Sequence, residues 1–278
     1  MLNSGYNMFL FHSTVLHLTE ITPDTFRIRL SNPENFARQF ISGQFVMVNV
    51  AGTSHLDPFL KRPFSISRLR PDGFELLIKV VGRGTKILQH MSVGKALSVH
   101  GPLGNGYPVH LIKKERKIML VAGGIGIASI ISLLDYCLES SYPLQNINLI
   151  LGSRTDSELI IIDEFLELAE KGLTLSISTD DGSKGHQGMV TDLVSRQLQN
   201  TGENPIIFSC GPLPMLAALG KLAMEESCPC FLSLESRMAC GFGACLGCIT
   251  RKKTKDNRHP WVKVCNDGPV FDAATLML

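Results

Sequence analysis

Four cysteines near the end of the chain have the spacing of an iron–sulfur site. Cys240, Cys245 and Cys248 form a C-x4-C-x2-C run, and Cys265 follows further along the chain. This is the plant-type spacing for the thiolate ligands of a 2Fe-2S cluster. The three glycines between the first three thiols let the backbone turn its N–H groups toward cluster sulfurs. We therefore predict that these four cysteines bind a 2Fe-2S cluster.

The same thiols allow a second interpretation, a structural zinc ion. Such sites commonly use two separated C-x2-C pairs, and only Cys245 and Cys248 form one here. A zinc-stabilised binding module is therefore the non-enzymatic alternative. Disulfides are disfavoured, because eight cysteines without a recognisable export signal indicate a reducing cytoplasm.

Length and composition limit the possible architectures. The chain has 278 residues, 44% hydrophobic and 19% charged, which suggests about two globular domains with sizeable cores. A net charge of +2 gives no reason to expect binding to nucleic acid or to a membrane. The longest apolar run, 118–134, contains three glycines and two serines. It is short for a transmembrane helix, so it is predicted to be a buried strand that leads into a helix.

The first part of the chain is rich in predicted strands. Short apolar or alternating segments at 26–30, 44–50 and 74–81 are separated by Gly, Pro and Asn-Pro turns. This pattern is typical of an antiparallel barrel or sandwich.

Two features of this part could hold a diphosphate. Arg62 and Ser65 can point at one ligand from the same strand, and an arginine fork donates two parallel hydrogen bonds to phosphate. Gly84 and Thr85 open a helical stretch whose free N–H groups suit a phosphate. Taken separately, Arg62 could be a surface ion-pair residue and 82–84 an ordinary turn.

From residue 111 the pattern changes to alternating strands and helices. Such repeats imply a parallel sheet with helices on both faces. The predicted strands are 117–122, 148–152, 173–178 and 205–209, and the predicted helices run through 138 and over 164–171, 190–197 and 215–225.

Nucleotides bind at the carboxyl ends of parallel strands. The glycine-rich turn at 123–126 lies at one such end, although it lacks the full G-x-G-x-x-G fingerprint. The segment 210–212 ends a second strand, and 152–154 and 180–182 could line the same cleft. Arg154 could meet the ribose phosphate of NADP, contact the adenosine side of NAD, or face solvent.

A basic segment follows the third cysteine. Residues 249–265 have the pattern of a hairpin whose tip carries five cations against one Asp256. The cations are Arg251, Lys252, Lys253, Lys255 and Arg258. The segment is either a solvated turn or a docking surface for an acidic partner.

The order of these features resembles the ferredoxin reductase family, and within it the electron transfer subunits of dihydroorotate dehydrogenase B. The resemblance covers about residues 10–275, and the long basic segment after Cys248 departs from it. The most similar passages are Arg62-Pro-Phe-Ser, Gly101-Pro-Leu-Gly-Asn-Gly, Gly123-Gly-Ile-Gly-Ile-Ala, Cys210-Gly-Pro, 235–248 and 264–271.

The resemblance implies three domains. These are an FAD-binding antiparallel β-barrel at 8–110, an NAD-binding α/β domain with a parallel sheet at 111–230, and a small 2Fe-2S domain at 231–278. The family's cluster ligands map onto the four cysteines above. The implied FAD contacts are Arg62, Pro63, Phe64, Ser65, Leu77, Ile78, Lys79, Gly84 and Thr85, and the candidate NAD contacts are Gly123, Gly124, Gly126, Cys210, Gly211 and Pro212.

The resemblance also implies an activity. Electrons would enter from an FMN-containing catalytic subunit through the cluster, pass to FAD and leave as a hydride on NAD⁺, in pyrimidine (UMP) biosynthesis. Dihydroorotate would be oxidised on the partner, so no catalytic residue for that step is expected here. Two subunits of each kind would form a cytoplasmic heterotetramer, with no nucleic acid or membrane. The alternatives are a subunit of a sulfide dehydrogenase, a subunit of an NADP-ferredoxin reductase, and an oxygenase reductase. Relatives of the first two kinds can replace one cluster cysteine with Asp.

Overall fold

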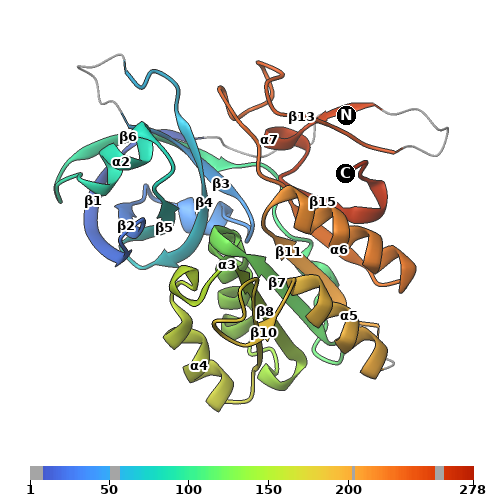
Figure 1. Cartoon of the computed structure of the whole chain (residues 1–278). Helices are drawn as coiled ribbons and strands as arrows, with labels where there is room; N and C mark the ends of the chain where they lie inside the picture. The colour runs from blue at the N-terminus through green and yellow to red at the C-terminus, as the bar shows by residue number, and fades with distance from the viewer. Residues whose placement is uncertain (1–8, 51–56, 202–203, 254–259) are drawn as a thin grey trace.

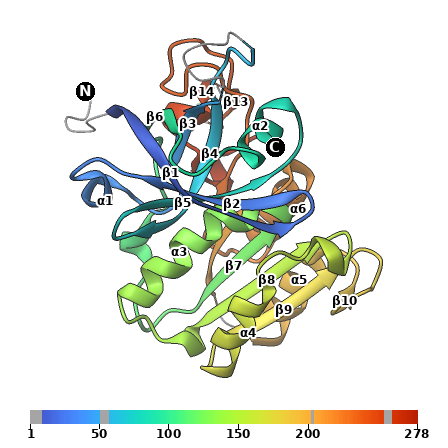
Figure 2. The same cartoon turned by 90° about the vertical axis from the view of Figure 1, so that its left-hand side faces the viewer.

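The computed structural model describes residues 9–50, 57–201, 204–253 and 260–278. The chain forms a β-barrel followed by a parallel sheet with helices on both faces, and the C-terminal segment lies against both (Figure 1). Helix α3 lies between the barrel and the sheet (Figure 2). None of the helices in these ranges is both long and apolar enough to span a bilayer.

The barrel is closed, with strand order β1-β2-β5-β4-β3-β6. Every pairing in it is antiparallel, as the alternating segments predict. Alternate side chains fill the barrel interior, Phe26, Ile28 and Leu30 among them. Its elements are β1 (Phe9–Thr22), β2 (Thr25–Ser31), α1 (Phe36–Gln39), β3 (Phe45–Asn49), β4 (Arg62–Arg70), β5 (Gly73–Lys79), α2 (Arg83–Gln89) and β6 (Ala96–Leu103).

The second domain contains a seven-stranded sheet of order β10-β9-β8-β7-β11-β12-β15. Helices α3 and α4 cover one face, and α5 and α6 cover the other. Its elements are β7 (Ile118–Gly123), α3 (Ile127–Glu139), β8 (Ile147–Ser153), α4 (Ile162–Glu170), β9 (Thr174–Thr179), β10 (His186–Gln187), α5 (Val190–Thr201), β11 (Ile206–Cys210) and α6 (Leu213–Glu225).

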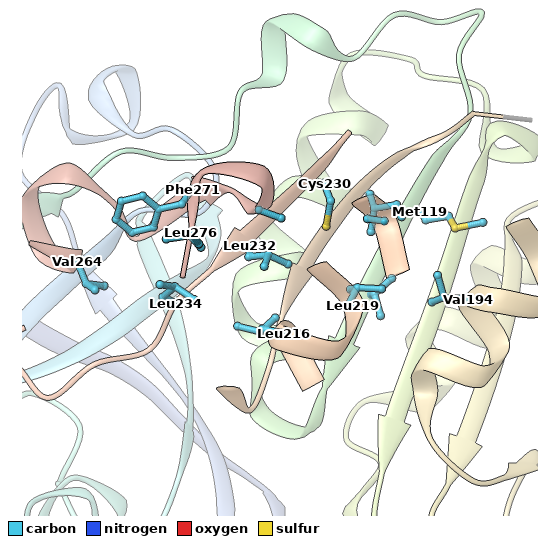
Figure 3. Packing of buried hydrophobic residues seen from close by; sticks show 14 of the residues in the cluster. Met119, Val194, Leu216, Leu219, Cys230, Leu232, Leu234, Val264, Phe271 and Leu276 are labelled. Atoms are coloured by element: carbon cyan, nitrogen blue, oxygen red, sulfur yellow. The ribbon is translucent and has the colours of Figure 1, made fainter. Parts of the chain in front are cut away.

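The C-terminal segment shares its sheet and core with the second domain. Strand β12 (Cys230–Ser233) pairs parallel with β11, and β15 (Val270–Asp272) pairs antiparallel with β12. Leu234, Val264 and Phe271 pack in one cluster with residues of α5 and α6, as Figure 3 shows. The segment therefore has no core separate from that of the second domain. Its other elements are β13 (Ile249–Arg251), β14 (Trp261–Lys263) and α7 (Val264–Asp267).

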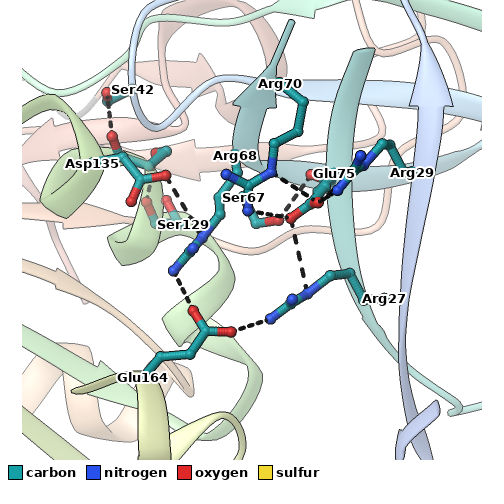
Figure 4. Close-up of polar contacts among 11 residues, drawn as sticks. Arg27, Arg29, Ser42, Ser67, Arg68, Arg70, Glu75, Ser129, Asp135 and Glu164 are labelled. Carbon is teal, nitrogen blue, oxygen red and sulfur yellow. Dashed lines mark hydrogen bonds and ion pairs between the residues drawn. The ribbon is translucent and has the colours of Figure 1, made fainter. Parts of the chain in front are cut away.

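A buried carboxylate organises one side of the barrel. Glu75 on β5 is 1% exposed and accepts hydrogen bonds from Arg29 at 2.8 Å and from Arg70 at 2.9 and 3.1 Å (Figure 4). Burial raises the pKa of Glu75, but the hydrogen bonds from Arg70 and Arg29 outweigh it and leave the pKa below its usual value.

Ion pairs close to Glu75 also connect the barrel to the second domain. Glu164 on α4 accepts 2.6 Å hydrogen bonds from Arg27 and Arg68 of the barrel. Arg68 Nε also lies 3.6 Å from a carboxylate oxygen of Asp135 on α3. These ion pairs join the barrel to two helices of the sheet, which fixes the orientation of the two domains.

Asp135 should give the interface a measurable pH dependence. Burial raises its pKa from 3.8 to about 6, despite Arg68 and Arg70, and Glu139 and Glu164 raise it further. A raised carboxyl pKa contributes stability that is full below pH 3.8 and is lost as the pH rises through 6. Asp135→Asn should therefore gain stability relative to wild type between pH 4 and 7, by up to about 3 kcal/mol.

Urea unfolding of the two proteins at several pH values measures this difference. Asp72→Asn is the control, because it removes the same charge from a half-exposed site 3.7 Å from Arg29. A difference between Asp135→Asn and wild type that does not change with pH would contradict the raised pKa.

Candidate functional site

A cavity of about 260 Å³ lies where the barrel meets the second domain and the C-terminal segment. Pocket walls from strands of one domain and loops of others are typical of cofactor sites. Most of the predicted flavin contacts line it, namely Pro63, Phe64, Ser65, Leu77, Ile78, Lys79 and Thr85.

The turn before α2 is built as a phosphate site would require. Thr85 Oγ1 accepts hydrogen bonds from the N–H groups of Val81 and Gly82 and donates to the Gly82 carbonyl. The threonine thus fixes the loop in front of α2, and the first N–H groups of a helix have no partner within the helix itself.

Two predicted flavin contacts lie beside the cavity and do not line it. Arg62 Nη1 donates to the Leu60 carbonyl, and its side chain covers Gly84. A Cβ at Gly84 would lie 3.1 Å from Arg62 Nε, so the glycine lets the guanidinium lie close to the helix start. The pair lies at one edge of the turn predicted to bind phosphate.

A second cavity, of about 470 Å³, opens at the carboxyl ends of the parallel strands. The two cavities share Lys79, Ile125 and Glu235 as wall residues. The two cavities are therefore adjacent, with these three residues between or beside them. The predicted residues that line the second cavity are Gly123, Gly124, Gly211 and Pro212.

The other two predicted nucleotide contacts, Gly126 and Cys210, do not line the second cavity. A Cβ at Gly126 would lie 2.2 Å from the Cys210 carbonyl oxygen, so this glycine allows α3 to start against the end of β11. Cys210 lines the first cavity, on the flavin side. Burial raises the pKa of the Cys210 thiol to about 12, so the thiol is neutral.

The segment after β12 is a wall of the first cavity that the sequence did not reveal. Leu234, Glu235, Ser236 and Met238 line it, together with Ser233 at the end of β12. Glu235 lines both cavities and is exposed to them, and partial loss of solvent around its carboxyl raises the pKa of that group. The sequence pointed to this segment only through the similarity of 235–248 to the family, and that similarity predicted no contact with the flavin.

The loop that carries the first three cysteines turns its backbone toward the thiols. Gly243 N–H donates to Cys265 Sγ at 3.1 Å, and Cys245 N–H donates to Cys240 Sγ at 3.5 Å. Cys265 N–H donates to Cys248 Sγ at 3.4 Å. Gly241, Gly243 and Leu246 have positive φ angles of 83°, 88° and 58°, which turn the peptide planes inward.

These donors favour a thiolate at Cys240, whereas burial and the Cys248 thiol raise the pKa of Cys265 to about 12. Burial opposes ionisation of Cys240, but the N–H groups of Cys245, Phe242 and Ala244 lower the pKa of its thiol to about 6. In the described part of the chain, no three His, Cys, Asp or Glu side chains lie close enough to share one metal ion. The residues fit a cluster through these N–H donors, which iron–sulfur ligands require.

The cysteine loop packs directly on the barrel. A Cβ at Gly241 would lie 2.4 Å from Met47 of β3, and Leu103 of β6 is close by. Asn105 N–H, just after β6, donates to the Gly268 carbonyl at 2.6 Å. The cysteine loop therefore lies next to β3, whose Phe45 lines the first cavity.

The predicted hairpin forms from β13 and β14, and Arg251 stacks 4.7 Å over the Trp261 ring. Lys252 and Lys253 lie within the described residues, whereas Lys255, Asp256 and Arg258 lie outside them. The docking interpretation of this segment stays a prediction.

Three family models match the chain. Residues 12–107 match the oxidoreductase FAD-binding domain, 120–221 the oxidoreductase NAD-binding domain, and 235–277 the iron–sulfur cluster binding domain of dihydroorotate dehydrogenase B. Together with the observed barrel and parallel sheet, they confirm the predicted fold class and the three cofactors, FAD, NAD and a 2Fe-2S cluster.

A solved structure of similar fold is described as an NADH-dependent reduced ferredoxin-NADP oxidoreductase. It has a TM-score of 0.78 and 27% identity, over 100% of this chain and 91% of that chain. A ferredoxin NADP⁺ reductase from Neisseria gonorrhoeae, with TM-score 0.66 and 18% identity over 78% of this chain and 91% of that chain, shares the fold.

Curated relatives cover nearly the whole chain. The electron transfer subunit of dihydroorotate dehydrogenase B (NAD(+)) from Fusobacterium nucleatum is 38% identical, over 94% of this chain and 96% of the relative. That of Lysinibacillus sphaericus is 36% identical, over 95% and 97%. The chain belongs to the family of dihydroorotate dehydrogenase B electron transfer subunits.

Proposed function

We propose that the chain carries electrons from a partner catalytic subunit to NAD⁺, and that the partner oxidises dihydroorotate with FMN. The observation that carries the proposal is the continuity of the three sites. The cysteine loop packs on the barrel, the segment after β12 closes the first cavity, and that cavity shares walls with the second. The names of the relatives supply the substrate and the coenzyme.

Each site has residues suited to its task. FAD, when bound, accepts single electrons and releases two as a hydride, a conversion that no side chain provides. The turn fixed by Thr85 would hold its diphosphate, and Phe64, Ser65 and Lys79 would orient the ring. The glycines at 123 and 124 leave backbone room for the dinucleotide diphosphate.

The partner would dock at the cysteine loop. Cys245 is exposed, and the apolar side chains of Phe242 and Leu246 in the same loop are 43% and 60% exposed, as is Trp261 on the following hairpin at 57%. Exposed apolar side chains around a redox site suit a stable protein interface that brings two centres close. We propose a cytoplasmic complex of two subunits of each kind.

The test is reconstitution with the candidate catalytic subunit. The two proteins together should reduce NAD⁺ with dihydroorotate, and neither should do so alone. Reduction of a dye by NADH with the electron transfer subunit alone checks that its flavin is loaded. A complex that co-elutes and retains dye reduction, yet never reduces NAD⁺ with dihydroorotate, would overturn the proposal.

A further inference from the structure

The inference concerns the end of the dinucleotide cleft that lies away from the flavin cavity. Strands β8 and β9 neighbour each other on the side of β7 opposite β11. Cys210, at the end of β11, lines the flavin cavity, so the hydride-accepting ring belongs at that side. The adenosine ribose then belongs at the ends of β8 and β9, where Arg154 and Asp180 line the cleft.

Arg154 is the cation that could bind a phosphate on this ribose, but it is already engaged. Its Nη2 lies 2.5 Å from Oε1 of Glu158, and its Nε donates to Oε2 at 3.2 Å. Both oxygens of the carboxylate are thus used by one guanidinium, the strongest geometry for such a pair. Glu158 raises the pKa of Arg154, as this pairing requires.

Glu158 is held where it is by other contacts. It ends a short 3-10 turn over Asp156–Glu158, and its side chain is 25% exposed, compared with 73% for Arg154. Lys79 Nζ lies 3.6 Å from Glu158 Oε2 and 3.4 Å from Asp24, and Lys79 is itself a wall of both cavities. The arginine is therefore the more exposed partner, and the glutamate is the more enclosed one, with Lys79 as a second cationic neighbour.

We propose that Glu158 makes the cleft selective for NAD over NADP by occupying the guanidinium of Arg154. The inference rests on the proposed dinucleotide site and names the residue that decides its coenzyme. A 2′-phosphate brought here would meet a neutralised arginine and the carboxylates of Glu158 and Asp180, which repel it. A 2′-hydroxyl carries no charge and can donate a hydrogen bond to a carboxylate.

The test measures mononucleotide binding by calorimetry at one fixed, low ionic strength. The probes are 5′-AMP and 2′,5′-ADP, which differ in the 2′-phosphate and need no electron transfer. Wild type should bind 5′-AMP at least tenfold more tightly than 2′,5′-ADP. Glu158→Gln should bind 2′,5′-ADP about tenfold more tightly than wild type does, while its affinity for 5′-AMP changes less than about threefold.

Two further variants test whether the gain in affinity for 2′,5′-ADP comes from Arg154. The double variant Glu158→Gln, Arg154→Ala should lose this gain, because the freed guanidinium is gone. Glu225→Gln removes the same charge from the Lys221 pair on α6, outside the cleft, and should leave both affinities as in wild type.

The outcomes separate the inference from the proposed function. Wild type that binds 5′-AMP, with no gain for 2′,5′-ADP in Glu158→Gln, would overturn the selection by Glu158. An equal gain in Glu225→Gln, or a gain that survives Arg154→Ala, would overturn it as well. Failure of wild type to bind either mononucleotide would overturn the dinucleotide cleft itself, whatever the result with dihydroorotate.

Discussion

Replacing Cys240 with alanine is expected to lower dihydroorotate-dependent reduction of NAD⁺ by the reconstituted complex at least 100-fold. Alanine cannot ligate iron, and the cluster is the group that we propose accepts electrons from the partner. The flavin cavity lies on the barrel side of the loop, so reduction of a dye by NADH should stay within about threefold of wild type. Both rates and the visible absorption of the purified protein are the measurements.

Cys228→Ala is the matched control for this variant. Cys228 is a buried free thiol outside the four predicted ligands, so its loss should leave both rates unchanged. If Cys240→Ala lost both activities equally, the cluster would serve stability and not electron entry. If Cys240→Ala kept the dihydroorotate-dependent rate, the assignment of Cys240 as a ligand would be wrong.

Glu75→Ala should destabilise the protein by about 3–5 kcal/mol, because it leaves three arginines together without their shared carboxylate. Thermal unfolding should shift downward by about 10 °C. The depressed pKa of Glu75 means that its contribution is present above pH 4.5 and is lost as the pH falls through the lower, folded-state value. The gap between variant and wild type should therefore narrow in acid.

Glu225→Ala is the control, because its partner Lys221 lies 3.8 Å away on an exposed helix face. An exposed pair of this kind contributes at most about 1 kcal/mol. A fall in melting temperature equal to that of Glu75→Ala, or no fall in Glu75→Ala, would show that the arginine cluster does not depend on Glu75.

Local patterns predicted most elements, because alternation and strand–helix repeats are set by which side chains must be buried. The strands at 26–30, 117–122 and 148–152 all form within one or two residues of the prediction. These local patterns did not show that part of the C-terminal segment belongs to the sheet of the second domain. Strands β12 and β15 extend the sheet of the second domain, and pairing between distant strands leaves no local pattern in the sequence.

The charge network was also invisible in the sequence. Arg27, Arg68 and Glu164 are far apart in the chain, and each alone reads as an ordinary surface charge. Only the docking of α4 against the barrel brings them within hydrogen-bond distance. The same holds for Glu158 and Arg154, whose spacing suggests a helix pair but not their place in a cleft.

The sequence by itself indicated which cofactors this protein binds. Four cysteines at cluster spacing, the predicted phosphate turn at Thr85 and a glycine-rich strand end each depend on residue type and spacing, which are local properties. Only the tertiary structure decided how these sites connect. Glu235 and Lys79 become shared walls of two cavities because the barrel, the sheet and the C-terminal segment pack at one point, and such packing depends on contacts distant in sequence.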